Sequence, residues 1–349
     1  MTAALAPWQV RVLRQAIDAY VQGRLGHGML LTGPAHLGKK AVAEALAQRI
    51  LCPTPGPEGF ACGACRSCRQ FAAQTVGLLV TQTHGDLQRV GLEPNDKGDK
   101  LRNDIVVDQI RKLGHWFSLS AQFGGAKVAV IEPADLLNTA AGNALLKTLE
   151  EPAPERFLLL VSSRPGRLPA TIRSRCQRLE FRVPPADEAI AWLRTQGVAV
   201  SDASDALTAA RGNPGQAAHW LREGGLRIRG EVLKGLESLR EGRASPIELA
   251  QAWLADEHAA LRLRFAAELA LDAAARGLGA QHAARAAVPG LTPPADFPKL
   301  SIWFDGINRL REQLGAPLRH DLVLAGLLLD WRTLYDAAGS SRASGRRSG

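Results

Sequence analysis

The chain has 349 residues, of which 46% are hydrophobic, so it is long enough and apolar enough for two or three globular domains. No apolar run approaches the length of a membrane span, and the first residues lack the basic and apolar segments of a secretory signal. We therefore expect a cytoplasmic protein without a membrane segment. The net charge of +9 permits a nucleic-acid or acidic protein partner without proving one.

The first predicted elements surround a glycine-rich turn. Residues 7–21 carry apolar side chains at helical spacing, and a short apolar strand at 29–31 precedes the turn. Residues 33–40 match the P-loop pattern G-x-x-x-x-G-K, and a helix is expected over 41–51. A strand, a glycine turn and a helix in this order are what a phosphate-binding loop needs. The candidate nucleotide-binding residues are Gly33, Gly38 and Lys39.

The residue after the P-loop lysine departs from the pattern. Lys40 stands where a working NTPase carries the Ser or Thr whose hydroxyl ligates Mg²⁺. The loop can still bind phosphate through its backbone N–H groups, or neighbouring side chains can occupy it. We therefore expect ATP to bind weakly or not at all.

Four closely spaced cysteines follow the helix. Cys52, Cys62, Cys65 and Cys68 form the pattern C-x9-C-x2-C-x2-C, and closely spaced thiols in a cytoplasmic chain more often hold a metal than form disulfides. Four thiolates suit a closed, tetrahedral, structural Zn²⁺ site. An iron–sulfur cluster and reduced free thiols are the alternatives. The fifth cysteine, Cys176, is expected to be a small buried residue.

Strands and helices then alternate. Strands are expected at 78–81, 128–131 and 157–161, and helices at 69–75 and 105–117. A further helix, with Asn138 as its N-cap, should end before Pro152, and the charged segment 93–103 should be a loop. This alternation predicts the α/β class, with a parallel sheet covered by helices on both faces.

The strand at 128–131 occupies the place of a Walker B strand. An active P-loop ATPase of this kind ends that strand with Asp-Glu, whereas this chain has Glu132-Pro133. Proline has no carboxylate, so no base remains to orient the attacking water. Together with Lys40, this change predicts an ATPase scaffold that no longer hydrolyses ATP.

Composition changes after Pro184-Pro185, where strand signals end and Ala, Leu and Arg dominate. We expect an α/β domain over 1–183, a small helical domain over 184–224 and an all-α domain over 225–336, with an internal break at 289–294. The tail 337–349 is rich in Gly, Ser and Arg and is expected to be disordered and basic.

Several motifs together resemble the bacterial clamp-loader AAA+ family. They are the P-loop, the four-cysteine module, the segment G-G-A-K-V at 124–128 with its strand, the segment N-A-L-L-K-T-L-E-E-P at 143–152, and Ser174-Arg175-Cys176. The specific motifs cover about the first 220 residues. The resemblance implies an AAA+ α/β domain with an inserted zinc module, a helical lid domain and an all-α collar domain that serves oligomerisation.

The resemblance also implies functional roles. In this family the arginine that corresponds to Arg175 enters the ATP site of the neighbouring subunit as an arginine finger, and gamma-like subunits carry a sensor-2 arginine at the position of Gly215. The implied protein is a non-hydrolysing subunit of the DNA polymerase III clamp loader. Its implied partners are the gamma/tau and delta subunits and, through the complex, the sliding clamp and primer-template DNA.

Two other functions compete with this interpretation. The first is an active gamma/tau-like clamp-loader ATPase with unusual motifs, which Lys40, Pro133 and Gly215 disfavour. The second is a zinc-dependent DNA-binding protein. The cysteine module lacks a base-reading helix after its ligands, which favours a structural zinc instead.

Overall fold

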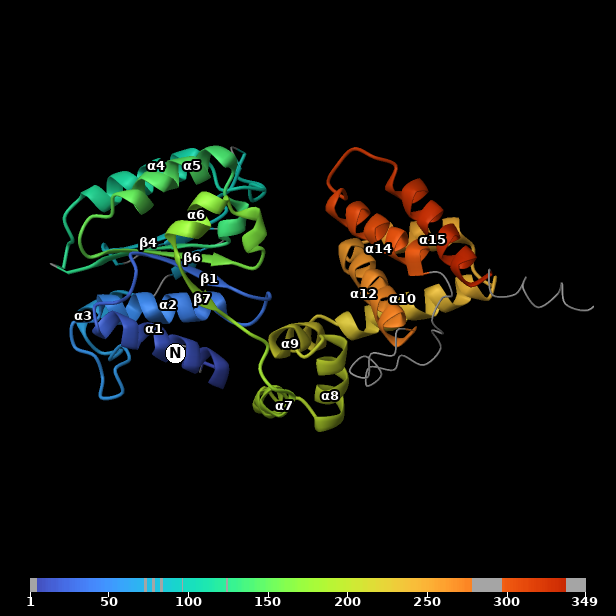
Figure 1. Cartoon of the computed structure of the whole chain (residues 1–349), viewed down its shortest axis with the longest axis horizontal. Coiled ribbons are helices and arrows are strands. Elements are labelled where there is room, and N and C mark those ends of the chain that lie inside the picture. Colours follow the sequence, from blue (N-terminus) through green and yellow to red (C-terminus); the bar gives the residue numbers. More distant parts are fainter. Residues whose placement is uncertain are drawn as a thin grey trace, which may run out of the picture. The chain divides into compact units, whose positions relative to one another are not determined.

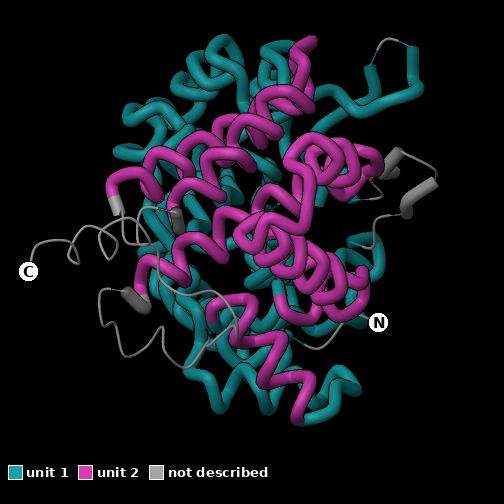
Figure 2. Tube along the Cα trace, turned by 90° about the vertical axis from the view of Figure 1, so that its right-hand side faces the viewer, with its two compact units in different colours: residues 1–200, 212–216 teal, residues 201–211, 217–349 magenta. Residues whose placement is uncertain are grey.

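The computed structural model describes residues 5–71, 74–76, 79–81, 84–95, 97–123, 125–277 and 297–336. The chain forms two compact units, which Figure 2 shows in two colours: residues 1–200 with 212–216, and residues 201–211 with 217–349. Along the described residues, no helix combines the length and the apolar character that crossing a bilayer requires.

A five-stranded parallel sheet forms the centre of the first unit. Its order is β4-β5-β6-β1-β7, and each neighbouring pair is parallel. The parallel sheet predicted from the sequence is confirmed. The strands are β1 (Gly28–Thr32), β4 (Leu87–Val90), β5 (Lys127–Ile131), β6 (Arg156–Ser162) and β7 (Gln177–Glu180).

Helices cover both faces of this sheet, as Figure 1 shows. Side chains of successive strand residues point to opposite faces, so Met29 and Leu31 pack in one core cluster and Leu30 in another. The first cluster includes α1 (Pro7–Val21) and α2 (Lys39–Leu51), and the second includes α4 (Val107–Ser118), α5 (Thr139–Glu150) and α6 (Ala170–Arg175). The helices therefore hold the carboxyl ends of the strands, where the motifs lie, on a rigid base.

Between the cysteine module and β4, one local expectation fails and another is confirmed over its described residues. The helix expected over 69–75 is instead α3 (Arg66–Gln70), and residues 74–75 lie in β2 (Gln74–Val76). The strand expected at 78–81 begins outside the described residues, and its remainder, β3 (Leu79–Thr81), pairs antiparallel with β2 in a separate hairpin. Apolar content predicted a strand here but not the sheet to which it belongs.

The N-cap of α5 follows the prediction. The Asn138 side chain accepts a hydrogen bond from the backbone N–H of Ala141 at 2.9 Å, which satisfies one of the free donors at the start of the helix. Helix α7 (Ala186–Thr195) also belongs to the first unit, where Trp192 packs edge-on against Trp8 with ring centroids 5.2 Å apart.

The described residues of the second unit form helices. Trp303 and Trp331 pack with ring centroids 4.6 Å apart, and the indole N–H of Trp331 donates to the Leu236 carbonyl at 3.2 Å. The expected break at 289–294 and the tail 337–349 lie outside the described residues. The helices are α8 (Val200–Ala209), α9 (Pro214–Arg222), α10 (Gly225–Arg240), α11 (Pro246–Leu254), α12 (Ala259–Gly277), α14 (Phe297–Glu312) and α15 (His320–Asp336).

The domain boundaries expected at 183, 224 and 336 stay predictions. The two units are defined by contacts, and the segment 184–224 is divided between them.

Candidate functional site

The P-loop connects β1 to α2, as the sequence predicts. Gly33 has φ +136°, and a Cβ at this residue would lie 2.3 Å from the Phe181 carbonyl oxygen. Only glycine fits so close to the neighbouring backbone. Gly38 is the N-cap of α2, and Lys39 is the first residue of that helix. The backbone of a phosphate-binding loop is therefore retained.

The side chain of Lys39 is turned onto the loop itself. Its Nζ donates to the carbonyl oxygens of Gly33 at 2.9 Å and Pro34 at 2.6 Å. The residue is only 5% exposed. Burial lowers the pKa of Lys39 to about 8, while the carboxylates of Asp135 and Glu132 act in the opposite direction. The ammonium that would bind phosphate is thus buried and engaged with backbone carbonyls.

Lys40 pairs with the acid at the end of β5. Its Nζ lies 2.8 Å from Oε2 of Glu132, with the two side chains 65% and 30% exposed. In a working site the residue at position 40 would supply a Mg²⁺ ligand, and the acid after the Walker B strand would act beside it. Here an ammonium and a carboxylate neutralise each other. Because the pair is largely exposed, its contribution to stability is at most about 1 kcal/mol.

Residues from a distant segment cover the loop. The Asn213 side-chain amide donates to the Ala35 carbonyl at 2.8 Å, although the two residues are 178 positions apart. A Cβ at Gly215 would lie 1.7 Å from the His36 carbonyl oxygen. Position 215 therefore has no room for a side chain unless the neighbouring backbone shifts. Asn213 was not predicted, and no local sequence signal marks it.

A second unpredicted residue, Asp135, lies beside the loop. Its carboxylate accepts hydrogen bonds from the Ser162 hydroxyl at 2.7 Å, the Ser163 N–H at 3.1 Å and Arg164 Nε at 3.3 Å. Burial alone would raise the pKa of Asp135, but these donors outweigh it and the pKa is lowered. In the sequence, only its place three residues after Glu132 could have pointed to Asp135. These contacts tie the end of β5 to the end of β6.

The four predicted cysteines come together. Their sulfur atoms all lie within 4.8 Å of one another, and the thiols are free. Adjacent sulfurs are 3.6 Å apart for Cys52 and Cys62, 3.9 Å for Cys52 and Cys65, and 3.9 Å for Cys62 and Cys68. In a tetrahedral Zn²⁺ site with bonds of about 2.3 Å, sulfurs are about 3.8 Å apart. The cluster can therefore hold a metal ion.

Local hydrogen bonds favour a thiolate at Cys62, whereas burial raises the pKa of Cys68. The backbone N–H groups of Cys62, Cys65 and Cys68 point at sulfurs 3.3–3.4 Å away. Hydrogen bonds from the Thr54 side chain and from the backbone N–H groups of Cys65 and Ala64 lower the pKa of Cys62 to about 6. A thiolate is the form that binds a metal. Three of the ligands lie within seven residues at the start of α3, and Cys52 comes from the end of α2.

A buried Ser–His–Asp group attaches the cysteine module to the sheet. The His84 Nδ1 accepts from the Asp86 backbone N–H at 3.1 Å, so its Nε2 carries the proton and donates to Ser67 Oγ at 2.8 Å. The Ser67 hydroxyl in turn donates to the Leu51 carbonyl at 2.7 Å. A histidine in this tautomer cannot take the serine proton, so the group holds structure and does not form a catalytic triad.

Arg175 is the last residue of α6. Its Nη2 lies 2.8 Å from Oε1 of Glu150, its Nη1 donates to the Thr171 carbonyl at 3.1 Å, and its side chain is 39% exposed. The adjacent Cys176 is 8% exposed, as expected for a small buried residue, and burial raises the pKa of its thiol to about 11.

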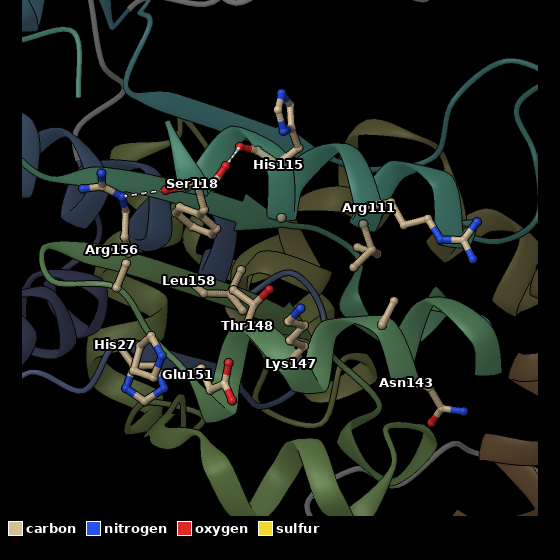
Figure 3. A pocket seen from close by; sticks show the side chains of 16 residues that line it. His27, Arg111, His115, Ser118, Asn143, Lys147, Thr148, Glu151, Arg156 and Leu158 are labelled. Atoms are coloured by element: carbon tan, nitrogen blue, oxygen red, sulfur yellow. Dashed lines mark hydrogen bonds between the residues drawn. The ribbon is translucent and has the colours of Figure 1, made fainter. Parts of the chain in front are cut away.

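A cavity of about 570 Å³ lies between α4 and α5 (Figure 3). Some of its polar side chains form hydrogen bonds within the chain. The His27 Nε2 lies 2.8 Å from the Leu149 carbonyl, and Arg156 donates to the carbonyls of Phe117 and Leu119, both at 3.1 Å. The described lining residues do not pair a nucleophile with a base, so the cavity does not resemble a catalytic centre.

Comparisons with known proteins confirm the resemblance. The sequence model of the family described as "DNA polymerase III, delta subunit" matches residues 8–185. The DNA polymerase III subunit delta' of Pseudomonas aeruginosa is 37% identical over 255 residues, or 72% of this chain and 72% of that protein. The subunit of the same name from Escherichia coli strain K12 is 32% identical over 340 residues, or 93% of this chain and 94% of that protein.

A relative with another subunit name matches a smaller part of the chain. The DNA polymerase III subunit tau of Bacillus subtilis is 29% identical over 174 residues, which are 50% of this chain and 28% of that protein. The delta' relatives match more of the chain at higher identity, in agreement with the changes at Lys40, Pro133 and Gly215. The chain belongs to the family of DNA polymerase III delta' subunits.

Proposed function

We propose that this chain is a non-hydrolysing subunit of the DNA polymerase III clamp loader, which helps to load the sliding clamp onto primed DNA. The observation that carries this proposal is the ion pair between Lys40 and Glu132 at 2.8 Å. It joins the two positions that would have to hold and use Mg²⁺. Phosphoryl transfer depends on that metal to neutralise charge on the β- and γ-phosphates. The chain therefore lacks a means to activate ATP.

The covered loop supports the same proposal. Asn213 and the backbone at Gly215 lie against the carbonyls of Ala35 and His36. Lys39 is engaged with its own loop. Gly33, Gly38 and Lys39 accordingly bind nucleotide weakly or not at all. A nucleotide would have to break these contacts before it gained any of its own.

We assign Arg175 as an arginine finger that acts on a neighbouring subunit. A guanidinium delivered in trans stabilises the charge that develops on the γ-phosphate. The support is the Ser-Arg-Cys motif, the family to which the chain belongs, and a side chain that is 39% exposed at the end of α6. The gamma/tau and delta subunits are the proposed partners, with the clamp and primer-template DNA reached through the complex in the cytoplasm.

The four cysteines are proposed to hold one structural Zn²⁺. The support is the tetrahedral spacing of the sulfurs and the completeness of the four-thiolate set, which leaves no open coordination position for catalysis. The helical domains at 184–224 and 225–336 are proposed as the lid and the oligomerising collar.

The experiment uses the assembled complex. Wild-type chain and the Arg175→Ala variant are each combined with gamma/tau and delta subunits, and assembly is checked by pull-down. We expect Arg175→Ala to assemble normally and to lower DNA-stimulated ATP turnover and clamp loading at least about tenfold, since an arginine finger can contribute about 10³–10⁵ in rate.

Arg178→Ala is the matched control, because Arg178 is another exposed arginine three residues further on. Arg173→Ala provides a second control for positive charge. An equal loss of ATP turnover in all three variants would show that Arg175 is an ordinary surface arginine. No loss from Arg175→Ala in an assembled complex would show the same.

A further inference from the structure

Arg175 is held by a residue from another helix. Glu150 is the last residue of α5, and Arg175 is the last residue of α6. Their side chains meet at 2.8 Å between Glu150 Oε1 and Arg175 Nη2, and the Thr171 carbonyl holds Nη1 at 3.1 Å. The guanidinium is therefore fixed from two sides, one belonging to its own helix and one to α5.

The two helices form a firm base for this contact. Leu145 of α5 and Ile172 of α6 are both fully buried in the same core cluster. A Cβ at Gly142 would lie 3.6 Å from Pro169 and 3.7 Å from Ile172, so the helices approach closely at a small residue. The relative position of Glu150 and Arg175 is thus set by packing and does not depend on the two side chains alone.

The location of Glu150 is unfavourable for its own helix. The C-terminal end of a helix carries a partial negative charge, and two adjacent carboxylates, Glu150 and Glu151, lie at the end of α5. A cation next to Glu150 offsets this repulsion. The end of α5 is therefore a place that attracts a guanidinium.

The contact leaves part of the guanidinium available. An arginine carries five N–H donors, and the two contacts engage one hydrogen each on Nη1 and Nη2. The side chain remains 39% exposed. We propose that Glu150 is a positioning residue, which holds Arg175 so that its remaining donors face the γ-phosphate in the neighbouring subunit. This inference rests on the proposed role of Arg175.

The advantage of such a contact is preorganisation. A free surface arginine samples many rotamers and must lose that freedom when the transition state forms. A side chain already fixed by Glu150 and Thr171 has lost most of it before ATP is bound. Because the stabilised charge exists only in the transition state, the benefit should appear in kcat and not in KM for ATP.

The test compares Glu150→Gln with Glu151→Gln in the reconstituted complex. Glutamine keeps the size of the side chain and removes the charge. Glu151 is the next residue along the chain and lines the cavity between α4 and α5 (Figure 3). We expect Glu150→Gln to lower kcat of DNA-stimulated ATP turnover about tenfold at unchanged KM, as is typical when a residue that orients a functional group is lost. Glu151→Gln should match the wild type.

A double variant separates positioning from a general structural role. If Glu150 acts through Arg175, the Glu150→Gln/Arg175→Ala variant should be no slower than Arg175→Ala alone. Unchanged turnover in Glu150→Gln, faster turnover, or a further loss in the double variant would overturn the inference. If Arg175→Ala itself has no effect, the proposed function fails and the positioning role fails with it. A loss in Arg175→Ala without one in Glu150→Gln removes only the positioning role.

Discussion

The P-loop and the four-cysteine module are both ligand-binding motifs in the sequence, but their polar groups make different contacts in the structure. In the P-loop, the chain supplies its own partners: Lys39 binds the loop carbonyls, Lys40 binds Glu132, and Asn213 binds Ala35. In the cysteine module, the sulfurs converge mainly on one another.

This difference suggests a way to distinguish a site that no longer binds its ligand from a site that can still bind one. Polar groups at a former binding site acquire internal partners, because a buried group without a partner costs free energy. Groups that still bind a ligand keep a geometry that the ligand alone completes. By this criterion we expect the nucleotide site to be closed, whereas the four cysteines can still hold a metal ion.

Metal removal should have the largest effect. Structural Zn²⁺ contributes about 10–16 kcal/mol of binding free energy in small zinc-finger peptides, so stripping it should open the segment 52–68. Protein purified without added zinc should contain one zinc ion per chain by elemental analysis. After chelation, hydrogen exchange should increase in the segment 52–68, with little change in β1 and β5.

Two cysteine variants provide the control for this experiment. Cys62→Ser should abolish metal binding, whereas Cys176→Ala, which changes the cysteine outside the cluster, should retain the full metal content. Metal content near zero in the wild type, or visible iron–sulfur absorbance, would show that the zinc assignment is wrong.

A side chain at position 215 should disturb the closed loop. The Gly215→Ala substitution places a Cβ 1.7 Å from the His36 carbonyl oxygen, so the loop or α9 must shift. We expect a loss of about 1–3 kcal/mol in the free energy of unfolding, as for other overpacked sites. Gly230→Ala is the matched control, because that helical glycine has open space around its Cβ and alanine there should be neutral or stabilising. Equal stability of the two variants would mean that α9 does not close the loop.

The smallest expected effect comes from Lys40→Ser. This substitution restores the hydroxyl that ligates Mg²⁺ and removes the partner of Glu132, at a cost of at most about 1 kcal/mol for an exposed ion pair. Nucleotide binding should stay weak with or without Mg²⁺, because Asn213 and Gly215 still cover the loop. Titration with a fluorescent ATP analogue measures this. Tight, Mg²⁺-dependent binding to Lys40→Ser would mean that Lys40 alone closes the site.

Local sequence signals predicted most of the α/β unit. The order of β1, P-loop and α2 follows from a short apolar run, two glycines and helical spacing, all within about 25 residues. The four cysteines were predicted to cluster because closely spaced thiols more often hold a metal than form disulfides where thiols stay reduced. The N-cap at Asn138 could be predicted because it involves only one side chain and the first turn of the helix that follows it.

Edge strands and long-range contacts could not be predicted in this way. The strands β4 and β7 lie at the two edges of the sheet, and their short, partly polar sequences resemble loops. The contact of Asn213 with Ala35 spans 178 residues. The pairing of Arg175 with Glu150 depends on the packing of α5 against α6. Each of these contacts is decided by tertiary structure, which leaves no periodic signal in the sequence.

A measurement of ATP turnover by the isolated chain shows whether the chain has lost ATP hydrolysis. Purified wild-type chain and the Lys39→Ala variant are each assayed with Mg²⁺ and ATP, with and without primed DNA. Because Lys40 binds Glu132 and Pro133 carries no carboxylate, we expect no turnover above background in either protein. Wild-type turnover that disappears in Lys39→Ala would contradict the account and favour an active ATPase of the gamma/tau type.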